Sequence, residues 1–339
     1  MTTMPTDVNR HKSITQIRPH VQKGTHPIET GRYLLATRQI SEFLERLDIW
    51  IEYRALGAIV HGNPRIGKTQ AIGYATRYVR EKYPALPVFQ HICKAHKTPN
   101  EDVFYTELLN SVGHKFQKQG KAWDKRERIS KFLITEAAGK ETNRVLFFMD
   151  DAQLMQDMHY KWWMDVQNTL SKEGIILTTI LVGQEELIQF RTILLDANQY
   201  QIVGRFMTNS HPFRGLETLI DVKECLKGYD EESEYPEGSG YSLTRYYFPE
   251  TYSSHGFRLQ NSANEVVSAI KQIRTHNGLY KKFELPMLFM TLATEYCLKR
   301  FGVDGGNLNK LTVKHWMEAF INVGYSDFVS KLKKGFPVQ

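Results

Sequence analysis

The sequence predicts an α/β fold in which a parallel sheet is flanked by helices, followed by a small C-terminal helical lid. The first observation is a glycine-rich loop at residues 62–69, which lies between a short apolar run and a segment of helical character. The second is a continuous apolar run at residues 145–149 that ends in two adjacent carboxylates. The third is the C-terminal part, where apolar residues recur at helical spacing.

The composition is that of an ordinary globular protein with a mild excess of basic residues. Of 339 residues, 41% are hydrophobic and 24% are charged, and the length suits one large or two modest domains. The formal net charge of +7 favours a polyanionic partner. Cys93, Cys225 and Cys297 make no metal or redox spacing, so we expect reduced thiols in a cytoplasmic protein. Because no apolar run has the length of a membrane span and no signal-peptide core is present, we expect no membrane partner.

The N-terminal part of the chain predicts an extension and then a helix. Residues 1–26 are polar and basic without sustained periodicity. We expect a flexible basic extension whose charges either contact a phosphate backbone or remain solvated. An α/β core would span residues 27–227, and its first helix covers about residues 33–53, where apolar side chains recur at helical spacing.

The loop after the apolar run 58–60 has the G-x-x-x-x-G-K-[ST] spacing of a phosphate-binding P-loop. Gly62 and Gly67 would let the backbone adopt positive φ and turn its N–H groups towards anionic oxygens. Lys68 would bring a positive charge to the β- and γ-phosphates, the Thr69 hydroxyl would bind Mg²⁺, and the next helix would point its positive end at the phosphates. The predicted nucleotide site consists of Gly62, Asn63, Pro64, Arg65, Ile66, Gly67, Lys68, Thr69 and Gln70.

The second landmark is the apolar run 145–149, which predicts a strand buried on both faces and ends in Asp150 and Asp151. In P-loop NTPases the first such carboxylate holds Mg²⁺ beside the P-loop hydroxyl, a role that suits Asp150. Asp151 is then placed to orient the attacking water. Two acids after a strand also suit a helix cap. Another buried strand, 175–182, leads to Gln184, which would lie beside the γ-phosphate if the two strands are neighbours.

The segments around these landmarks complete the expected core. A strand is predicted over residues 86–92, with helices over 101–116 and 157–170. The stretch 115–121 contains lysines and no acid. It is either a solvated helix end or a surface that contacts phosphate.

The C-terminal third predicts two further parts. Residues 228–262 would form a surface insertion with an acidic loop at 230–237 and a possible hairpin at 243–248. Residues 263–339 would form a helical lid, which would close over the nucleotide, and a basic tail.

This order of parts resembles an AAA+ ATPase, and more narrowly the TnsC/TniB regulators of DNA transposition. The matching segments are the Walker A loop 62–69, the Walker B run 147–153, the sensor 1 segment 181–184, Arg205-Phe206 at the arginine-finger turn, and a lid from 278 to 312. One departure is that Walker B ends in two aspartates, where the family usually has Asp-Glu. Because Asp151 is shorter by about 1.5 Å of reach, we expect slow ATP hydrolysis that suits a platform better than a motor.

The resemblance implies ATP and Mg²⁺ as cofactors and a homo-oligomeric ring or filament on double-stranded DNA. It implies a transposase and a TniQ-type target-selection protein, possibly with a CRISPR effector, as partners in the bacterial cytoplasm. In such an oligomer Arg205 would act in trans on the neighbour's γ-phosphate. Arg191 and Arg214 are rival fingers, and a plain surface role for Arg205 is the structural alternative.

DNA contacts would come from the inner face of that oligomer. The lysines expected to touch phosphates without reading bases are Lys115, Lys118, Lys121 and Lys161. No clear sensor-2 arginine is present in the lid, and Lys281 or Lys282 would substitute for it.

Three other classes of function fit parts of the sequence. A helicase-loader or replication-initiator AAA+ protein would share the mechanism but act on single strands and bind a helicase. A small-molecule P-loop kinase would transfer phosphate without any effect of DNA. An inert scaffold would bind ATP and show no nucleotide-dependent assembly.

Overall fold

The computed structural model describes residues 18–280 and 283–333, which form two compact units. One unit is Gln39–Arg214, and the other combines the described residues up to Arg38 with those from Gly215 onward. The basic tail beyond residue 333 lies outside the described residues.

The border between the units differs from the one expected near residue 227. Helix α10 (Leu219–Glu231) buries Val222, Cys225 and Leu226 in the core of the second unit. The α/β unit therefore ends at Arg214, because this helix finds its apolar partners among the C-terminal helices.

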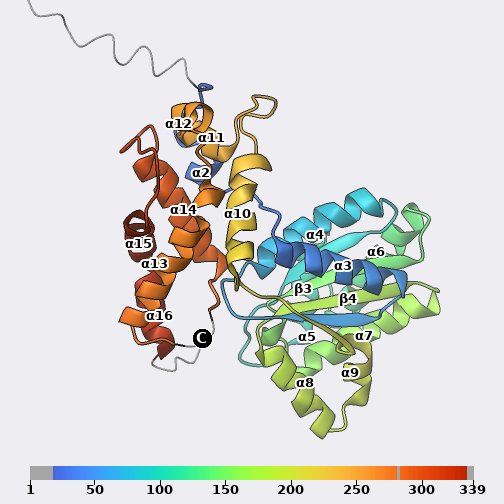
Figure 1. The fold of residues 1–339 in the computed structure, drawn as a ribbon. Coiled ribbons are helices and arrows are strands. Elements are labelled where there is room, and N and C mark those ends of the chain that lie inside the picture. The colour runs from blue at the N-terminus through green and yellow to red at the C-terminus, as the bar shows by residue number, and fades with distance from the viewer. Residues whose placement is uncertain (1–17, 281–282, 334–339) are drawn as a thin grey trace, which may run out of the picture. The chain divides into compact units, whose positions relative to one another are not determined.

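The α/β unit is built on a five-stranded sheet of order β2-β3-β4-β1-β5. Figure 1 labels two of its neighbouring strands, β3 and β4. All neighbouring strands are parallel, as predicted. The strands are β1 Gly57–His61, β2 Val88–Ile92, β3 Arg144–Asp150, β4 Ile176–Gly183 and β5 Asn209–Pro212. Because β4 lies between β1 and β3, the carboxyl ends of these three strands meet at one edge of the sheet.

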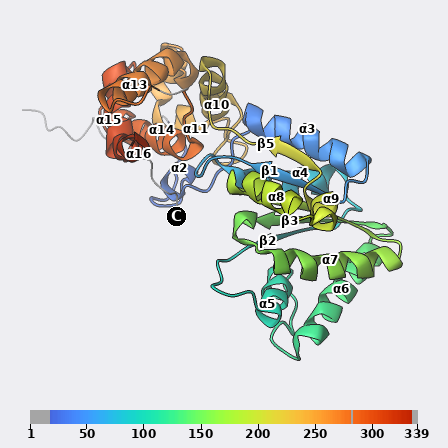
Figure 2. The same cartoon turned by 90° about the horizontal axis from the view of Figure 1, so that it is seen from below.

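Helices cover both faces of the sheet, as Figure 2 shows for α3 on one side and α5, α6 and α7 on the other. The first face carries α3 Arg38–Glu52 and α4 Lys68–Lys82. The second face carries α5 Glu101–Ser111, α6 Ala122–Gly139, α7 Asp157–Lys172, α8 Glu186–Asp196 and α9 Tyr200–Phe206. The helix expected over 33–53 starts only at Arg38.

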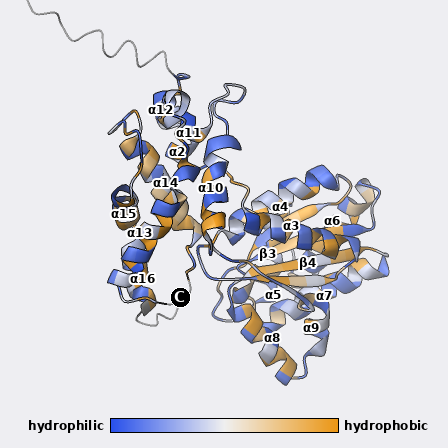
Figure 3. Cartoon of the chain, viewed as in Figure 1, coloured by the Kyte–Doolittle hydropathy of each residue, from blue (hydrophilic) through white to orange (hydrophobic). Residues whose placement is uncertain are grey.

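Strand β3 shows why the sheet is buried on both sides. Val145, Phe147 and Met149 pack in the core beneath α5–α9, whereas Leu146 and Phe148 pack in the core beneath α3 and α4. In Figure 3 the labelled strands β3 and β4 are mostly orange, whereas the helices around them mix orange with blue. This burial positions the end of β3 rigidly at the edge where the candidate site lies.

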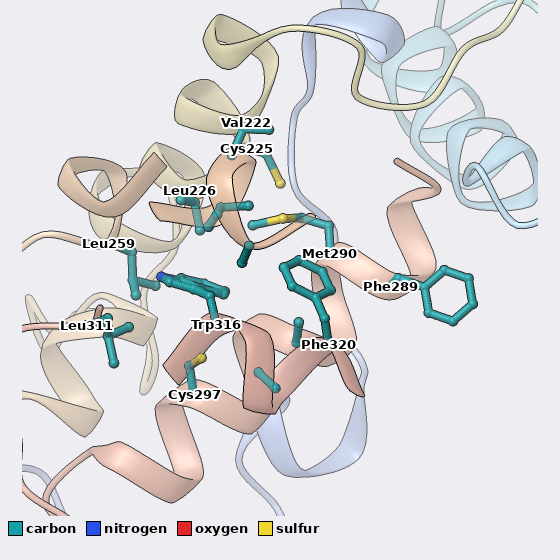
Figure 4. Packing of buried hydrophobic residues seen from close by; sticks show 14 of the residues in the cluster. Val222, Cys225, Leu226, Leu259, Phe289, Met290, Cys297, Leu311, Trp316 and Phe320 are labelled. Carbon is teal, nitrogen blue, oxygen red and sulfur yellow. The ribbon is translucent and has the colours of Figure 1, made fainter. Parts of the chain in front are cut away.

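The second unit is helical around its own core, part of which Figure 4 shows around Trp316, Phe320 and Met290. Its helices are α2 Pro27–Thr30, α10, α11 Leu243–Tyr247, α12 Pro249–Ser254, α13 Ala263–His276, α14 Met287–Phe301, α15 Val313–Asn322 and α16 Tyr325–Lys333. Within the described residues, no helix of either unit is long and apolar enough to cross a membrane.

The segment expected as a surface insertion contributes to this core. Residues 243–247 form helix α11 and no hairpin, because Leu243, Tyr246 and Tyr247 recur at helical spacing and are buried. Asp230, the first residue of the expected acidic loop, is 1% exposed and accepts the backbone N–H groups of Leu259 at 2.9 Å and of its neighbour Gln260 at 3.0 Å.

The described end of the expected flexible extension is also fixed in place. Arg18 donates to Asp304 at 2.6 Å and lies over the ring of Tyr246 at 4.5 Å from its centroid. His26 is buried and stacks on the same ring at 4.3 Å. Residues 1–17 lie outside the described part of the chain.

Candidate functional site

The P-loop occupies the turn between the end of β1 and the start of α4. Gly67 has a φ of 102°, and Arg65 has a φ of 66°, so the loop takes left-handed conformations at these two positions. The backbone of Gly62 does not have a positive φ, contrary to our expectation. It is required for a different reason, because a Cβ there would lie 2.0 Å from the carbonyl oxygen of Phe213.

Lys68 is the first residue of the 15-residue helix α4 and has a buried side chain. Its Nζ donates to the carbonyl oxygens of Gly62 at 2.7 Å and Asn63 at 2.8 Å. Burial lowers the pKa of Lys68, and the nearby charges of Asp150 and Asp151 oppose that effect. The ammonium group and the N-terminus of the helix together make the loop an anion site.

Asp150 is the last residue of β3 and is 2% exposed. Its Oδ1 accepts the backbone N–H of Asp151 at 3.0 Å, and its carboxylate is hydrogen-bonded to the Thr69 hydroxyl. Burial raises the pKa of Asp150, and the hydrogen bond from Thr69 lowers it. A carboxylate and a hydroxyl in contact at the end of a P-loop are the oxygen donors that Mg²⁺ prefers, so these residues fit that ion.

Asp151 lies half-buried beside Asp150 and has a φ of 52°, a left-handed conformation. Its side chain therefore does not continue the alternation of side chains along β3. Its Oδ1 accepts a hydrogen bond from the Nε2 of Gln153 at 3.0 Å. Gln184 follows β4, which pairs with both β1 and β3, so the condition that we set for its position is met. The edge therefore brings together the P-loop, both aspartates and Gln184.

Two residues of this edge escaped the sequence analysis as functional candidates. Gln153 bridges Asp151 and the backbone of Gln184, whose N–H donates to Gln153 Oε1 at 3.1 Å. His61, the last residue of β1, contacts the Glu185 carboxylate through its Nδ1 at 2.8 Å. Of the two, only Gln153 lies within a sequence motif, the Walker B segment, that could have marked it as a candidate. Its contact with Gln184 and the contact of His61 with Glu185 join residues that follow different strands, so both depend on the strand order.

Arg205 lies near the amino ends of strands β1 and β4, at the opposite end of these strands from the candidate site. A Cβ on Gly57, the first residue of β1, would lie 2.5 Å from the carbonyl oxygen of Arg205. The Nη1 of Arg205 donates to Gln167 Oε1 at 3.3 Å, and Gln167 in turn donates to the carbonyl of Leu177 near the start of β4. Since β1 ends at the P-loop, about 13 Å of strand separates Arg205 from the site of its own chain. The rival Arg191 donates to the carbonyl of Met207 at 3.5 Å.

The predicted DNA-contacting lysines fall on two elements. Lys115, Lys118 and Lys121 are exposed on the connection between α5 and α6 and make no ion pair among the described residues. Arg128 holds this connection, because its Nη1 donates to the carbonyls of Phe116 at 2.8 Å and Gln119 at 2.9 Å. Lys161 lies on α7 and pairs with Asp157 at 3.2 Å. Lys281 and Lys282 lie outside the described residues.

Comparisons with known proteins support the fold. Residues 51–190 match the model of an AAA domain. The Aeropyrum pernix ORC1 protein in complex with DNA superposes with a TM-score of 0.52 at 11% identity, covering 90% of this chain and 70% of that one. The Aeropyrum pernix ORC2 protein, in ADPNP-ADP complexes, gives a TM-score of 0.50 at 13% identity, covering 88% and 71%. No curated protein matches the sequence.

These similarities extend to the AAA domain and the ORC-type structures, and none of them points to the narrower TnsC/TniB group. The AAA match contains the P-loop, both aspartates and Gln184, which the parallel sheet brings to one edge. Residues 51–190 thus match an AAA domain, and the chain has the AAA+ P-loop fold.

Proposed function

We propose that the chain is a Mg²⁺-dependent ATPase of the replication-initiator or helicase-loader type, which binds DNA and assembles with further copies of itself in the ATP state. The observation that carries this proposal is the meeting of Lys68, Thr69, Asp150 and Asp151 at one edge of the sheet. The similarity to ORC1 in complex with DNA and to nucleotide-bound ORC2 supports the DNA and ATP parts.

Each residue of the site has a distinct task in this proposal. Lys68 and the backbone of the loop bind the phosphates, while Thr69 and Asp150 hold Mg²⁺. The ion, when bound, neutralises charge on the phosphate oxygens. The Asp151 carboxylate orients the attacking water, and its short side chain favours slow hydrolysis.

Arg205 would complete the site of a neighbouring copy. Its place at the amino ends of β1 and β4 removes it from the nucleotide of its own chain, so a catalytic role needs a second copy. A guanidinium that reaches across an interface makes the nucleotide part of that interface.

The lysines on the connection between α5 and α6 are the proposed DNA contacts. They are exposed and lack ion-pair partners among the described residues. They lie on a connection whose backbone carbonyls accept hydrogen bonds from Arg128. Exposed ammonium groups bind phosphates without sequence preference. Lys161 is the weaker candidate, because Asp157 already neutralises part of its charge.

A regulator of DNA transposition of the TnsC/TniB type is the second candidate. The order of the Walker A, Walker B, sensor 1 and arginine-finger segments in the sequence favours it. It would bind a transposase and a TniQ-type partner, whereas a helicase loader would bind a helicase. Comparing ATP-dependent assembly on duplex DNA and on single-stranded DNA separates the two, because a loader prefers single strands and a transposition regulator prefers duplexes.

Lys68→Ala is expected to weaken ATP binding by about 10- to 100-fold, because a charge-assisted contact is worth roughly 1.5–3 kcal/mol. Titration with a fluorescent ATP analogue measures this loss, and electron microscopy with single-stranded and with duplex DNA measures the loss of assembly. Lys82→Ala on the same helix is the control, since Lys82 pairs with Asp48 at 2.6 Å. Assembly of Lys68→Ala at the level of the parent would show that nucleotide is not the switch.

Asp150→Asn is expected to raise the melting temperature near neutral pH while weakening Mg²⁺-dependent ATP binding. Burial raises the pKa of Asp150, so its ionised form costs stability above the folded pKa. The gain should vanish as the pH falls below about 4, where the carboxyl is neutral in both states. Thermal unfolding in chelator over a pH series measures this difference.

The control for this measurement is Asp196→Asn, which changes an exposed aspartate at the end of α8. It should leave the melting temperature unchanged over the same pH series. A lower melting temperature for Asp150→Asn at neutral pH would mean that the hydrogen bonds of the carboxylate outweigh its desolvation.

Arg205→Ala is expected to keep ATP affinity within about twofold and to lose hydrolysis on the order of 10³-fold. Mixing it with Lys68→Ala should restore part of the ATPase rate, because one variant supplies an intact P-loop and the other an intact Arg205. Arg191→Ala serves as the comparator. If the mixture stays inactive while Arg191→Ala alone loses activity, the finger is Arg191.

Replacing Lys115, Lys118 and Lys121 together by alanine is expected to weaken DNA binding and to reduce the slope of log K against log salt by about 2–3, since each phosphate contact contributes about 0.9. Fluorescence anisotropy over a salt series measures both quantities. Lys172→Ala, an exposed lysine at the end of α7, is the control. An unchanged slope in the triple variant would place the DNA-binding surface elsewhere.

A further inference from the structure

We propose that Gln153 is a positioning residue for ATP hydrolysis. Its side chain fixes the position of the Asp151 carboxylate relative to the end of β4. This inference rests on the proposed ATPase function. The side-chain amide makes two hydrogen bonds at once: Nε2 donates to Asp151 Oδ1 at 3.0 Å, and Oε1 accepts the backbone N–H of Gln184 at 3.1 Å. Gln153 thereby joins the acid after β3 to the tip of its neighbouring strand.

Only a carboxamide suits these two partners. The ionised Asp151 carboxylate can only accept a hydrogen bond, and the N–H of Gln184 can only donate one. A glutamate at position 153 would accept from Gln184 but would face Asp151 with a second negative charge. Both contacts also fix the orientation of the amide, since the reversed group would set oxygen against oxygen and N–H against N–H.

The end of β4 is shaped around this amide. A Cβ on Gly183 would lie 2.4 Å from Gln153 Oε1 and 2.7 Å from the Leu187 Cδ1, so glycine leaves the space that the bridge occupies. The carbonyl oxygen of Gly183 also accepts the N–H of Gly62 at 3.3 Å. A continuous path of contacts therefore runs from Asp151 through Gln153 and the tip of β4 to the first glycine of the P-loop.

Asp151 needs an external support of this kind. It follows the strand in a left-handed conformation, and the residue is only half-buried. Gln153 is the one described side chain that donates to this carboxylate in the structure. Without the bridge the side chain can turn about χ1, and a misplacement of about 1 Å at a catalytic group can cost roughly a hundredfold in rate.

The bridge is separate from the groups that bind nucleotide. Lys68 donates to the loop carbonyls, and Thr69 contacts Asp150. Loss of the bridge should therefore lower kcat and leave nucleotide affinity unchanged, which is the signature of an interaction that acts on the chemical step.

The test measures kcat, KM and the affinity for a non-hydrolysable ATP analogue in Gln153→Ala and Gln153→Glu. We expect kcat to fall about 10- to 100-fold in both, with KM and analogue affinity within about twofold of the parent. The matched control is Gln156→Ala, which removes another half-buried amide whose Nε2 donates to the carbonyl of His96 at 3.0 Å and does not touch Asp151. Its kcat should stay near that of the parent.

A double-mutant cycle with Asp151→Asn separates positioning from a merely structural role. If Gln153 acts through Asp151, adding Gln153→Ala to Asp151→Asn should change the residual kcat by less than about twofold. A loss of equal size in both backgrounds, or a single variant with the kcat of the parent, would overturn the inference. Should Gln153→Ala unfold, the similar-sized Gln153→Glu carries the test. A parent chain without any ATPase activity would instead refute the proposed function.

Discussion

The site depends on one constraint, which is that β4 lies between β1 and β3. The three strands are parallel, so everything that follows them along the chain is delivered to the same edge of the sheet. The hydrogen bond from Gly62 N–H to the carbonyl of Gly183 continues the pairing of β1 and β4 into the P-loop. A slip of one residue between these strands would turn their core side chains to the opposite faces and disperse the site.

This arrangement buries two charged side chains of the site, which costs folding free energy. Lys68 and Asp150 are both buried. Burial lowers the pKa of Lys68 and raises the pKa of Asp150, so it favours the neutral form of each side chain. The apolar layers on the two faces of the sheet compensate for that cost, with fully buried residues such as Phe147 and Phe148 directly before the aspartates. The site is thus rigid because its immediate surroundings are close-packed.

The sequence predicted the parts of the fold whose signals are local. Spacing in the P-loop and the apolar run before Asp150 identified β1, α4 and β3 correctly, because both motifs need strands buried on two faces. Strand β5 escaped prediction, since its four residues Asn209–Pro212 form a polar edge strand without an apolar pattern. Helix α6 was hidden by its charged residues, one of which, Lys125, is buried in an ion pair with Asp102 at 2.7 Å. The contact of Gln153 with Gln184 depends on the order of strands β3 and β4, and the contact of Arg205 with Gln167 depends on the packing of two helices; no local pattern reveals either.

The helical unit is discontinuous along the chain, and this has a consequence for how it forms. Ile28 and Leu35 are part of its core, yet their partners come from α10 onward, after the whole α/β unit has intervened. During synthesis these two side chains leave the ribosome before the helices from α10 onward exist, whereas the α/β unit emerges as one uninterrupted segment. The α/β unit is therefore free to form first. The helical unit forms last, because its two segments, up to Arg38 and from Gly215, must come together across the long stretch of chain between them.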